Sequence, residues 1–250
     1  MVISMYQFFV EPSQIQGNQI IITGKDVNHI KNVLRMKKGE EISVSNGVDG
    51  KEYGCEIEEL SDQEIVCALR FVKEDGAELP CRVSLFQGLP KADKMELIIQ
   101  KAVELGVYEI VPVVTARAVV KLDEKKAKSK LLRWQGIAEA AAKQSKRRII
   151  PQVKPVMTMK EAVAYSGSSQ VRVIPYELAN GMEQTKKIME NLKPGEDIAV
   201  FIGPEGGFEE SEIALAAEAG IVPITLGKRI LRTETAGMTV LSWVMYQLEN

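Results

Sequence analysis

The apolar residues follow two different periods along the chain. Up to about Lys73 they tend to alternate with polar residues, most clearly in the runs 53–57 and 65–71. A period of two predicts half-buried β-strands. After the polar segment 74–80, short apolar runs alternate with helical segments, which is typical of βαβ units around a parallel sheet. The pattern therefore predicts a small β domain followed by a larger α/β domain.

In the first part, the segment 46–50 is Asn-Gly-Val-Asp-Gly. Residues of these types tolerate positive φ, so the segment suits a hairpin between strands at 42–45 and 52–57. One helix interrupts the strands, with Thr23 as its N-cap and Asp26 three residues on. We expect a mainly antiparallel domain, in which this helix buries one face formed by Val27, Ile30, Val33 and Leu34.

In the second part, we expect five buried strands, near Val83 to Gln87, Glu109 to Val114, Val171 to Pro175, Ile198 to Ile202 and Val222 to Leu226. Pro90 opens the first helix, and Gly106 is placed to end it in the left-handed conformation. The C-terminal helix has Thr233 or Thr235 as its cap. Its apolar positions are Val240, Leu241, Val244 and Leu248.

Composition narrows the class of protein. The 250 residues are 45% hydrophobic and 26% charged, which is typical of globular chains, and the net charge of −2 does not indicate a polyanionic partner. The single histidine, His29, and three cysteines without a C-x-x-C spacing exclude ordinary zinc sites and a disulfide framework. With no long apolar run or leader pattern, we expect no membrane span and a cytoplasmic, reducing location, with the cysteines buried as thiols.

Two glycine-bearing turns are the best candidates for a binding site. The chain lacks both phosphate-loop and dinucleotide fingerprints, which disfavours an NTPase or an ordinary dinucleotide enzyme. Instead, 202–208 and 226–236 each follow a predicted strand and precede a helix. Ligands bind at the carboxyl ends of strands in open α/β sheets, and glycine lets the backbone approach them closely. A purely structural turn is the alternative for 202–208, with Glu209, Glu210 and Glu212 complementing the helix dipole.

The motifs Gly203-Pro204-Glu205-Gly206-Gly207 and Leu226-Gly227-x-Arg229-Ile230-Leu231-Arg232-x-Glu234-Thr235-Ala236 resemble the bacterial ribosomal RNA small subunit methyltransferase E family, which methylates N3 of a uridine in 16S rRNA. The resemblance extends over the whole chain through His29-x-x-x-Val33-Leu34-Arg35, the runs 89–96 and 100–106, Arg117, Arg133-Trp134 and Gln144-Ser145-x-Arg147. Two positions depart from it: Gln7 stands where the family usually has arginine, and Ala140 where glutamate is expected.

The resemblance implies an α/β protein of the SPOUT class. A PUA-like RNA-binding β-barrel would span 1–73, a linker 74–80, and a domain with a mainly parallel sheet and a deep trefoil knot 81–250. It implies a homodimer that uses S-adenosylmethionine and acts on 16S rRNA within the 30S subunit, without a metal. The implied cofactor-binding residues are Pro175, Tyr176, Glu177, Ile202, Gly203, Pro204, Glu205, Gly206, Gly207, Leu226, Gly227, Ile230, Leu231, Arg232, Thr235 and Ala236.

The near-neutral charge conceals a local excess. Between Arg117 and Lys154 there are twelve Lys or Arg against three acids, so this stretch carries +9 and the remainder of the chain −11. Such asymmetry suits phosphate binding, although a charge run is more often a solvated helix face. With the resemblance, the expected RNA-binding residues are Arg35, Lys37, Lys91, Lys94, Arg117, Arg133, Lys146, Arg147, Arg148 and Arg229.

Methylation at N3 requires that the uridine lose the N3 proton. Glu234 is the first candidate general base and Glu205 the second, because burial tunes a carboxylate upward. Arg232 is a candidate for stabilising the developing charge, and His29 is a weaker base candidate than either glutamate. An ion pair of Glu234 with Arg229 or Arg232 is the structural alternative. Two other functions stay open: a SPOUT ribose 2′-O methyltransferase, and a non-catalytic ribosome-assembly protein that binds RNA.

Overall fold

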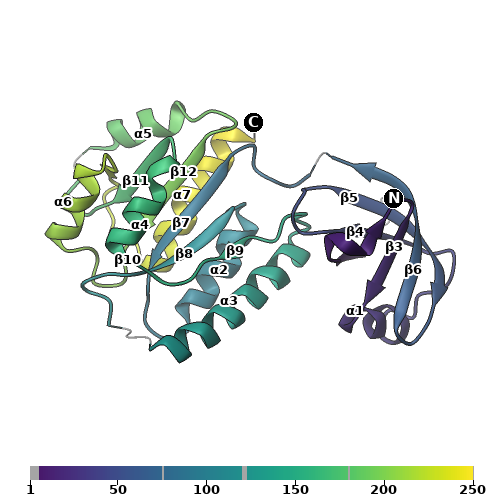
Figure 1. Cartoon of the computed structure of the whole chain (residues 1–250). Coiled ribbons are helices and arrows are strands. Elements are labelled where there is room, and N and C mark those ends of the chain that lie inside the picture. The colour runs from purple at the N-terminus through teal and green to yellow at the C-terminus, as the bar shows by residue number, and fades with distance from the viewer. Residues whose placement is uncertain (1–5, 75, 120–122, 180, 250) are drawn as a thin grey trace. The chain divides into compact units, whose positions relative to one another are not determined.

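The computed structural model describes residues 6–74, 76–119, 123–179 and 181–249, which form two compact units (Figure 1). The first contains the chain up to Glu78 together with Ala142–Ile150, and the second contains Leu79–Ala141 and the chain from Pro151 onward. The first unit therefore differs from the predicted range 1–73, because a segment from the middle of the sequence groups with it. No helix in the described part of the chain is long and apolar enough to cross a membrane.

The first unit is built on a six-stranded sheet. Its strand order is β1-β4-β5-β6-β3-β2; β1 and β4 are parallel and the other neighbours antiparallel. The alternating residues Ile20, Ile22, Ile42 and Ile65 are fully buried or nearly so, as the period of two predicts. The strands are β1 (Gln7–Phe9), β2 (Ile15–Gln16), β3 (Gln19–Thr23), β4 (Glu41–Ser45), β5 (Glu52–Leu60) and β6 (Glu64–Lys73), with a short 3-10 helix at Pro12–Gln14.

The helix of this unit differs from its prediction. It consists of α1 (Lys25–Asn28) and a π-helical segment, His29–Val33, and its N-cap is Gly24 rather than Thr23. The wider π turn changes which side chains face the core. Ile30 is therefore buried as expected, whereas Val33 is 61% exposed.

The segment 142–150 is attached to the first sheet by buried polar contacts. The amide nitrogen of Gln7 donates to the Arg147 carbonyl oxygen at 2.9 Å. Arg147 and Arg148 are only 3% and 8% exposed, and their guanidinium groups lie 2.5 Å from carboxylate oxygens of Glu78 and Glu52, respectively. Gln7 thus has a structural role in the first unit.

The second unit contains a seven-stranded sheet whose neighbouring strands are parallel. Its order is β10-β8-β7-β12-β11-β13, and β9 also pairs with β8. The five predicted strands are confirmed, although the last ends at Ile224 rather than Leu226. The strands are β7 (Arg82–Gly88), β8 (Glu109–Val114), β9 (Gln152–Val153), β10 (Met157–Thr158), β11 (Val171–Pro175), β12 (Asp197–Ile202) and β13 (Val222–Ile224).

Helices lie on both faces of this sheet (Figure 1). Phe86 and Phe201 stack at 4.3 Å between ring centroids, in a core with residues of α4 and α6. On the opposite face, Gly237 of α7 approaches Leu85 and Ile202. The helices are α2 (Lys94–Glu104), α3 (Glu124–Gln144), α4 (Met159–Tyr165), α5 (Met182–Glu190), α6 (Glu210–Glu218) and α7 (Thr233–Leu248), with a 3-10 turn at Ser166–Ser168.

Two helix starts differ from the predictions. The first helix begins at Lys94, four residues after Pro90, because Ala92 has a positive φ of 54° that interrupts the helical backbone. The last helix begins at Thr233 with Arg232 at the N-cap position, so neither predicted threonine is its cap. Gly106 has a φ of 88° and ends α2 as predicted.

Candidate active site at the carboxyl ends of the strands

A pocket of about 560 Å³ lies where β11, β12 and β13 end. These strands are neighbours and parallel, so the loops that follow them meet at one edge of the sheet. Every predicted cofactor-binding residue except Thr235 lines this pocket: 175–177, 202–207, Leu226, Gly227, 230–232 and Ala236. The structure adds Lys94, Phe208, Thr225, Lys228, Arg229 and Thr233 to the lining.

Glycine at two positions permits close packing beneath the pocket. A Cβ atom on Gly88, at the end of β7, would lie 2.6 Å from Pro204 Cδ. A Cβ on Gly203 would lie 3.2 Å from the backbone of Gly207. The first glycine-bearing turn therefore folds tightly on itself and against β7, and a side chain at Gly88 would force the two segments apart.

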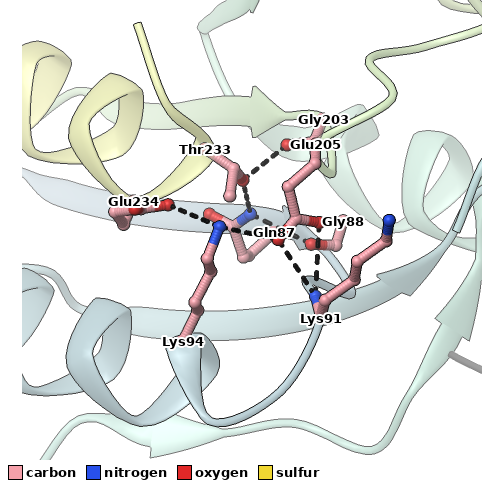
Figure 2. Close-up of polar contacts among 8 residues, drawn as sticks. All are labelled: Gln87, Gly88, Lys91, Lys94, Gly203, Glu205, Thr233 and Glu234. Carbon is pink, nitrogen blue, oxygen red and sulfur yellow. Dashed lines mark hydrogen bonds and ion pairs between the residues drawn. The ribbon is translucent and has the colours of Figure 1, made fainter. Parts of the chain in front are cut away.

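A chain of hydrogen bonds connects three elements below the pocket (Figure 2). The Gln87 amide nitrogen donates to Thr233 Oγ1 at 2.9 Å, and the Thr233 hydroxyl donates to the Gly203 carbonyl oxygen at 2.6 Å. Gln87 is 0% exposed, and its Oε1 has no hydrogen-bond partner among the described residues. The chain ties β7 and α7 to the glycine-bearing turn. The sequence pattern did not identify Gln87, because an amide in a buried strand has no local signature.

Lys94 brings two carboxylates together at the wall of the pocket (Figure 2). Its Nζ lies 2.8 Å from Glu205 Oε1 and 3.5 Å from Glu234 Oε2. Glu234 is thus paired with Lys94, whereas the sequence suggested Arg229 or Arg232 as its partner. Lys94 was expected to bind RNA, and its position in α2, distant in sequence from both glutamates, concealed this contact.

The two glutamates occupy different environments. Glu205 lines the pocket and accepts the Lys91 backbone N–H at 3.2 Å. Burial acts to raise the pKa of Glu205, but the hydrogen bonds from Lys94 and from backbone N–H groups lower it below its usual value. Glu234 is not part of the pocket lining, and within the described residues its Oε2 has no hydrogen-bond partner beyond the ion pair.

The hydrogen bond from Lys94 to Glu205 raises the pKa of Lys94 above its ordinary value. The lysine therefore stays positively charged throughout the neutral range, and two carboxylates share one ammonium group. The cluster carries a net charge of −1 with both carboxylates ionised. Such an arrangement can exchange a proton with a ligand while it keeps a fixed positive charge nearby.

Arg117 supports the glycine-bearing turn from the loop that follows β8. Its guanidinium donates to the Gly206 carbonyl oxygen at 3.1 Å. The neighbouring Ala116 N–H donates to Glu212 Oε1 at 2.9 Å, and Glu212 also completes the capping box of α6 with Glu209. This loop therefore contacts both the glycine-bearing turn and the first turn of α6.

The basic residues predicted to bind RNA fall into two groups. Arg147 and Arg148 are buried in ion pairs, so an RNA phosphate would have to displace Glu78 or Glu52 to reach them. Arg133 is largely exposed although it pairs with Glu96 at 2.8 Å. The side chain of Lys94 is 28% exposed at the pocket wall. The other six predicted residues are exposed: Arg35, Lys37, Lys91, Arg117, Lys146 and Arg229.

The local charge excess is partly neutralised by acids from outside the stretch. Five of its basic residues pair with acids that precede Arg117 in the sequence. The predicted phosphate footprint is therefore weaker than the charge count indicates. These acids are Asp26, Glu52, Glu78, Glu96 and Glu109. Lys121, one of the twelve, lies outside the described residues.

Comparisons with known proteins show which family the chain matches. The profile of an RNA methyltransferase domain matches residues 77–245, and that of an RNA methyltransferase PUA domain matches 22–69. The ribosomal RNA small subunit methyltransferase E of Bacillus subtilis (strain 168) is 38% identical, with 98% of each chain covered.

Two solved structures share the whole fold. The ribosomal RNA small subunit methyltransferase E of Neisseria gonorrhoeae, bound to S-adenosyl methionine, has a TM-score of 0.82 at 31% identity, with 95% of each chain covered. A putative methyltransferase of Legionella pneumophila, in complex with SAM, has a TM-score of 0.81 at 31% identity, with 97% of each chain covered.

The fold and the pocket thus define an RNA methyltransferase with an N-terminal PUA domain. The extent of the similarity makes the assignment more specific. The chain belongs to the ribosomal RNA small subunit methyltransferase E family.

Proposed function

We propose that this protein transfers the methyl group of S-adenosylmethionine to N3 of a uridine in 16S ribosomal RNA. The observation that carries the proposal is the Lys94–Glu205–Glu234 cluster, which lies beside a pocket formed by both glycine-bearing turns in a chain of this family. The cluster provides a proton acceptor, which methylation of a ring nitrogen that bears a proton requires, and a positive charge, which stabilises the anion that forms.

The pocket suits S-adenosylmethionine in size and in chemistry. Its volume of about 560 Å³ is in the range of small-ligand sites. Ile202, Leu226 and Leu231 offer apolar surface to the adenosine, and the glycine-bearing turn offers backbone at close range. The cofactor supplies an electrophilic methyl group on a sulfonium: the N3–C bond forms as the S–C bond breaks, and the electron pair of that bond goes to sulfur.

Side chains of the protein accept the proton that leaves N3 of the uridine. Glu205 lines the pocket whereas Glu234 does not, so we assign Glu205 as the acceptor of the N3 proton on the basis of access. Its hydrogen bonds from Lys94 and backbone N–H groups lower its pKa, contrary to the upward shift expected from burial, so it is a weaker base than the sequence suggested. Glu234 then holds Lys94 in place as a second counter-ion. This order reverses the sequence-based preference, which placed both glutamates in cofactor-lining turns, whereas only Glu205 of the two lines the pocket. Arg232, exposed on the pocket lining, is positioned for a phosphate of the target strand.

RNA binding in this proposal depends on the exposed basic residues Arg35, Lys37, Lys91, Arg117, Arg133, Lys146 and Arg229. Each phosphate contact strengthens binding and increases its dependence on salt. Arg147 and Arg148 are not included, because their guanidinium groups already neutralise buried carboxylates. We further infer from the family that the protein is a homodimer with a trefoil knot, and that the assembled 30S subunit is its substrate.

Mass spectrometry of the nucleosides from 16S rRNA tests the proposal. We expect N3-methyluridine to disappear when the gene is removed and to return when it is restored, and purified protein to form it with S-adenosylmethionine. A 2′-O-methylated nucleoside instead would indicate the ribose methyltransferase alternative. Absence of any new methylation, with no S-adenosylmethionine binding by calorimetry, would indicate a non-catalytic RNA-binding protein.

A further inference from the structure

Lys94 lines the pocket, and ion pairs of different length with two glutamates hold its ammonium group in position. It is the first residue of α2 and is far in sequence from both glycine-bearing turns. Its side chain nevertheless contacts Glu205 of one turn and Glu234 of the other. The bond to Glu205 is the shorter one, at 2.8 Å, and the side chain of Lys94 keeps 28% of its surface exposed. The ammonium is therefore accessible from the pocket that it lines.

We propose that Lys94 is a catalytic residue that donates a hydrogen bond to a carbonyl oxygen of the target uracil and stabilises the uridinate formed on loss of the N3 proton. This inference rests on the proposed function and adds to it the group that makes N3 acidic in the complex. Uridinate shares its negative charge between N3 and the two ring carbonyl oxygens. A fixed positive charge beside one of these oxygens lowers the free energy of the anion.

The proton transfer changes the partners of Lys94 without changing the net charge of the site. The N3–H bond breaks, its electron pair stays on the base, and the proton passes to a carboxylate oxygen of Glu205. Neutral Glu205 ceases to be a counter-ion, and the uridinate takes its place beside the ammonium. Glu234 keeps its ion pair with Lys94 and anchors it during the exchange. The cluster and base together carry −1 before and after the step.

Arg232 lines the same pocket, as do Lys228 and Arg229, and it differs from Lys94 in how it is held. Lys94 has two carboxylate partners on separate elements. Arg232 stands exposed at the N-cap position of α7. A pre-positioned charge stabilises an anion more than a mobile one, because no reorganisation is needed when the charge develops. The geometry therefore favours Lys94 as the residue that stabilises the uracil anion, and Arg232 as a residue that contacts an RNA phosphate.

Fluorine NMR measures the proposed effect directly and without methyl transfer. An RNA substrate carries 5-fluorouridine at the uridine that the wild-type protein methylates, and the fluorine shift is followed against pH in the complex. We expect the wild-type protein to lower the N3 pKa relative to free RNA. Lys94→Met should remove about one unit or more of that lowering, equivalent to tenfold in the ionisation equilibrium.

Single-turnover methylation with unmodified uridine gives a second measurement. Lys94→Met should lose roughly 100-fold in rate, by analogy with removal of one donor to an oxyanion. The loss should be smaller with 5-fluorouridine, because the electron-withdrawing fluorine already acidifies N3. Affinity for S-adenosylmethionine by calorimetry should stay within about threefold of the wild-type value, roughly 0.7 kcal/mol. Lys94→Gln, which retains a hydrogen-bond donor without the charge, is the second variant if the methionine variant does not fold.

Lys101→Met is the matched control, because Lys101 lies in the same helix and pairs with Glu104 outside the pocket. It should leave the N3 pKa and the rate unchanged. The inference is overturned if Lys94→Met and Lys94→Gln retain the wild-type N3 pKa, or if Arg232→Met removes the lowering instead. It is also overturned if Glu234→Gln restores the rate of Lys94→Met, since Lys94 would then only neutralise that carboxylate. Absence of N3-methyluridine with the wild-type protein overturns the proposed function itself.

Discussion

At the scale of the residue, the site separates two carboxylates by their surroundings. Glu205 faces the pocket and accepts a backbone N–H as well as the lysine, whereas Glu234 reaches the site only through Lys94. Two acids with different environments usually serve different purposes in one site. Substitution of Glu205 and substitution of Glu234 should therefore lower the rate of methylation by different amounts.

Glu205→Gln should lower the single-turnover rate by about 10²- to 10⁴-fold, because the amide cannot accept the N3 proton. Glu234→Gln should lower it less, since Lys94 retains its shorter bond to Glu205. S-adenosylmethionine affinity, measured by calorimetry, separates lost chemistry from lost binding. Glu183→Gln, on the exposed first turn of α5, is the control. A larger loss for Glu234→Gln would restore Glu234 as the base.

Glu205 also predicts a dependence of stability on pH. Because its pKa is lowered in the folded protein, Glu205 contributes stability that is present above the unfolded-state pKa and lost as the pH falls through the folded-state value. The difference in stability between the wild type and Glu205→Gln should therefore be constant near neutral pH, and its pH-dependent part should be lost as the pH falls below the folded-state pKa of Glu205. Urea unfolding at a series of pH values tests this. A difference that grew with acidity would contradict the sign.

At the scale of the element, the pocket depends on how closely β7 approaches the turn after β12. The two meet at Gly88 and Pro204, where a Cβ atom has no room. By contrast, Gly136 lies within α3 with no atom within 4 Å of its would-be Cβ. The same substitution should therefore have opposite effects at the two sites.

Gly88→Ala should destabilise the second unit by about 1–3 kcal/mol and weaken S-adenosylmethionine binding, because the turn must move. Gly136→Ala should stabilise it by about 0.5–1 kcal/mol through its helix propensity and leave binding unchanged. Urea unfolding followed by tryptophan fluorescence is a suitable measurement, since Trp134 and Trp243 both belong to this unit. Equal effects of the two substitutions would show that the close approach at Gly88 is not required.

At the scale of the whole molecule, residues that were expected to bind RNA instead complete the first unit. Arg147→Ala leaves Glu78 without its guanidinium partner. We expect opening of the first unit to become easier by about 2 kcal/mol, or roughly 30-fold, somewhat less than for a fully buried pair because Glu78 retains some contact with water. Hydrogen exchange of the amides in β4 and β5 measures this opening. Lys38→Ala, an exposed residue of the same unit, should have little effect, and equal exchange in both variants would contradict the structural role.

Sequence patterns predicted what depends on local periodicity and adjacency. The strands at Glu109–Val114 and Val171–Pro175 have the predicted bounds. The cofactor-binding residues came from the resemblance to a family rather than from periodicity, and all of them except Thr235 line the pocket. Contacts between distant segments were not predictable in this way. Lys94 and Glu234 are far apart in sequence, and the π turn that exposes Val33 has no signal in an apolar period.

The grouping of Ala142–Ile150 with the N-terminal strands has a consequence for protein synthesis. A ribosome releases the six strands of the first sheet long before it reaches Arg147 and Arg148, so Glu78 and Glu52 emerge without their partners. The first unit must therefore wait, incompletely formed, while helices α2 and α3 are translated. Its final folding requires the chain up to Ile150, whereas the last 100 residues, 151–250, all belong to the second unit. The first unit therefore has its complete chain before the second unit does.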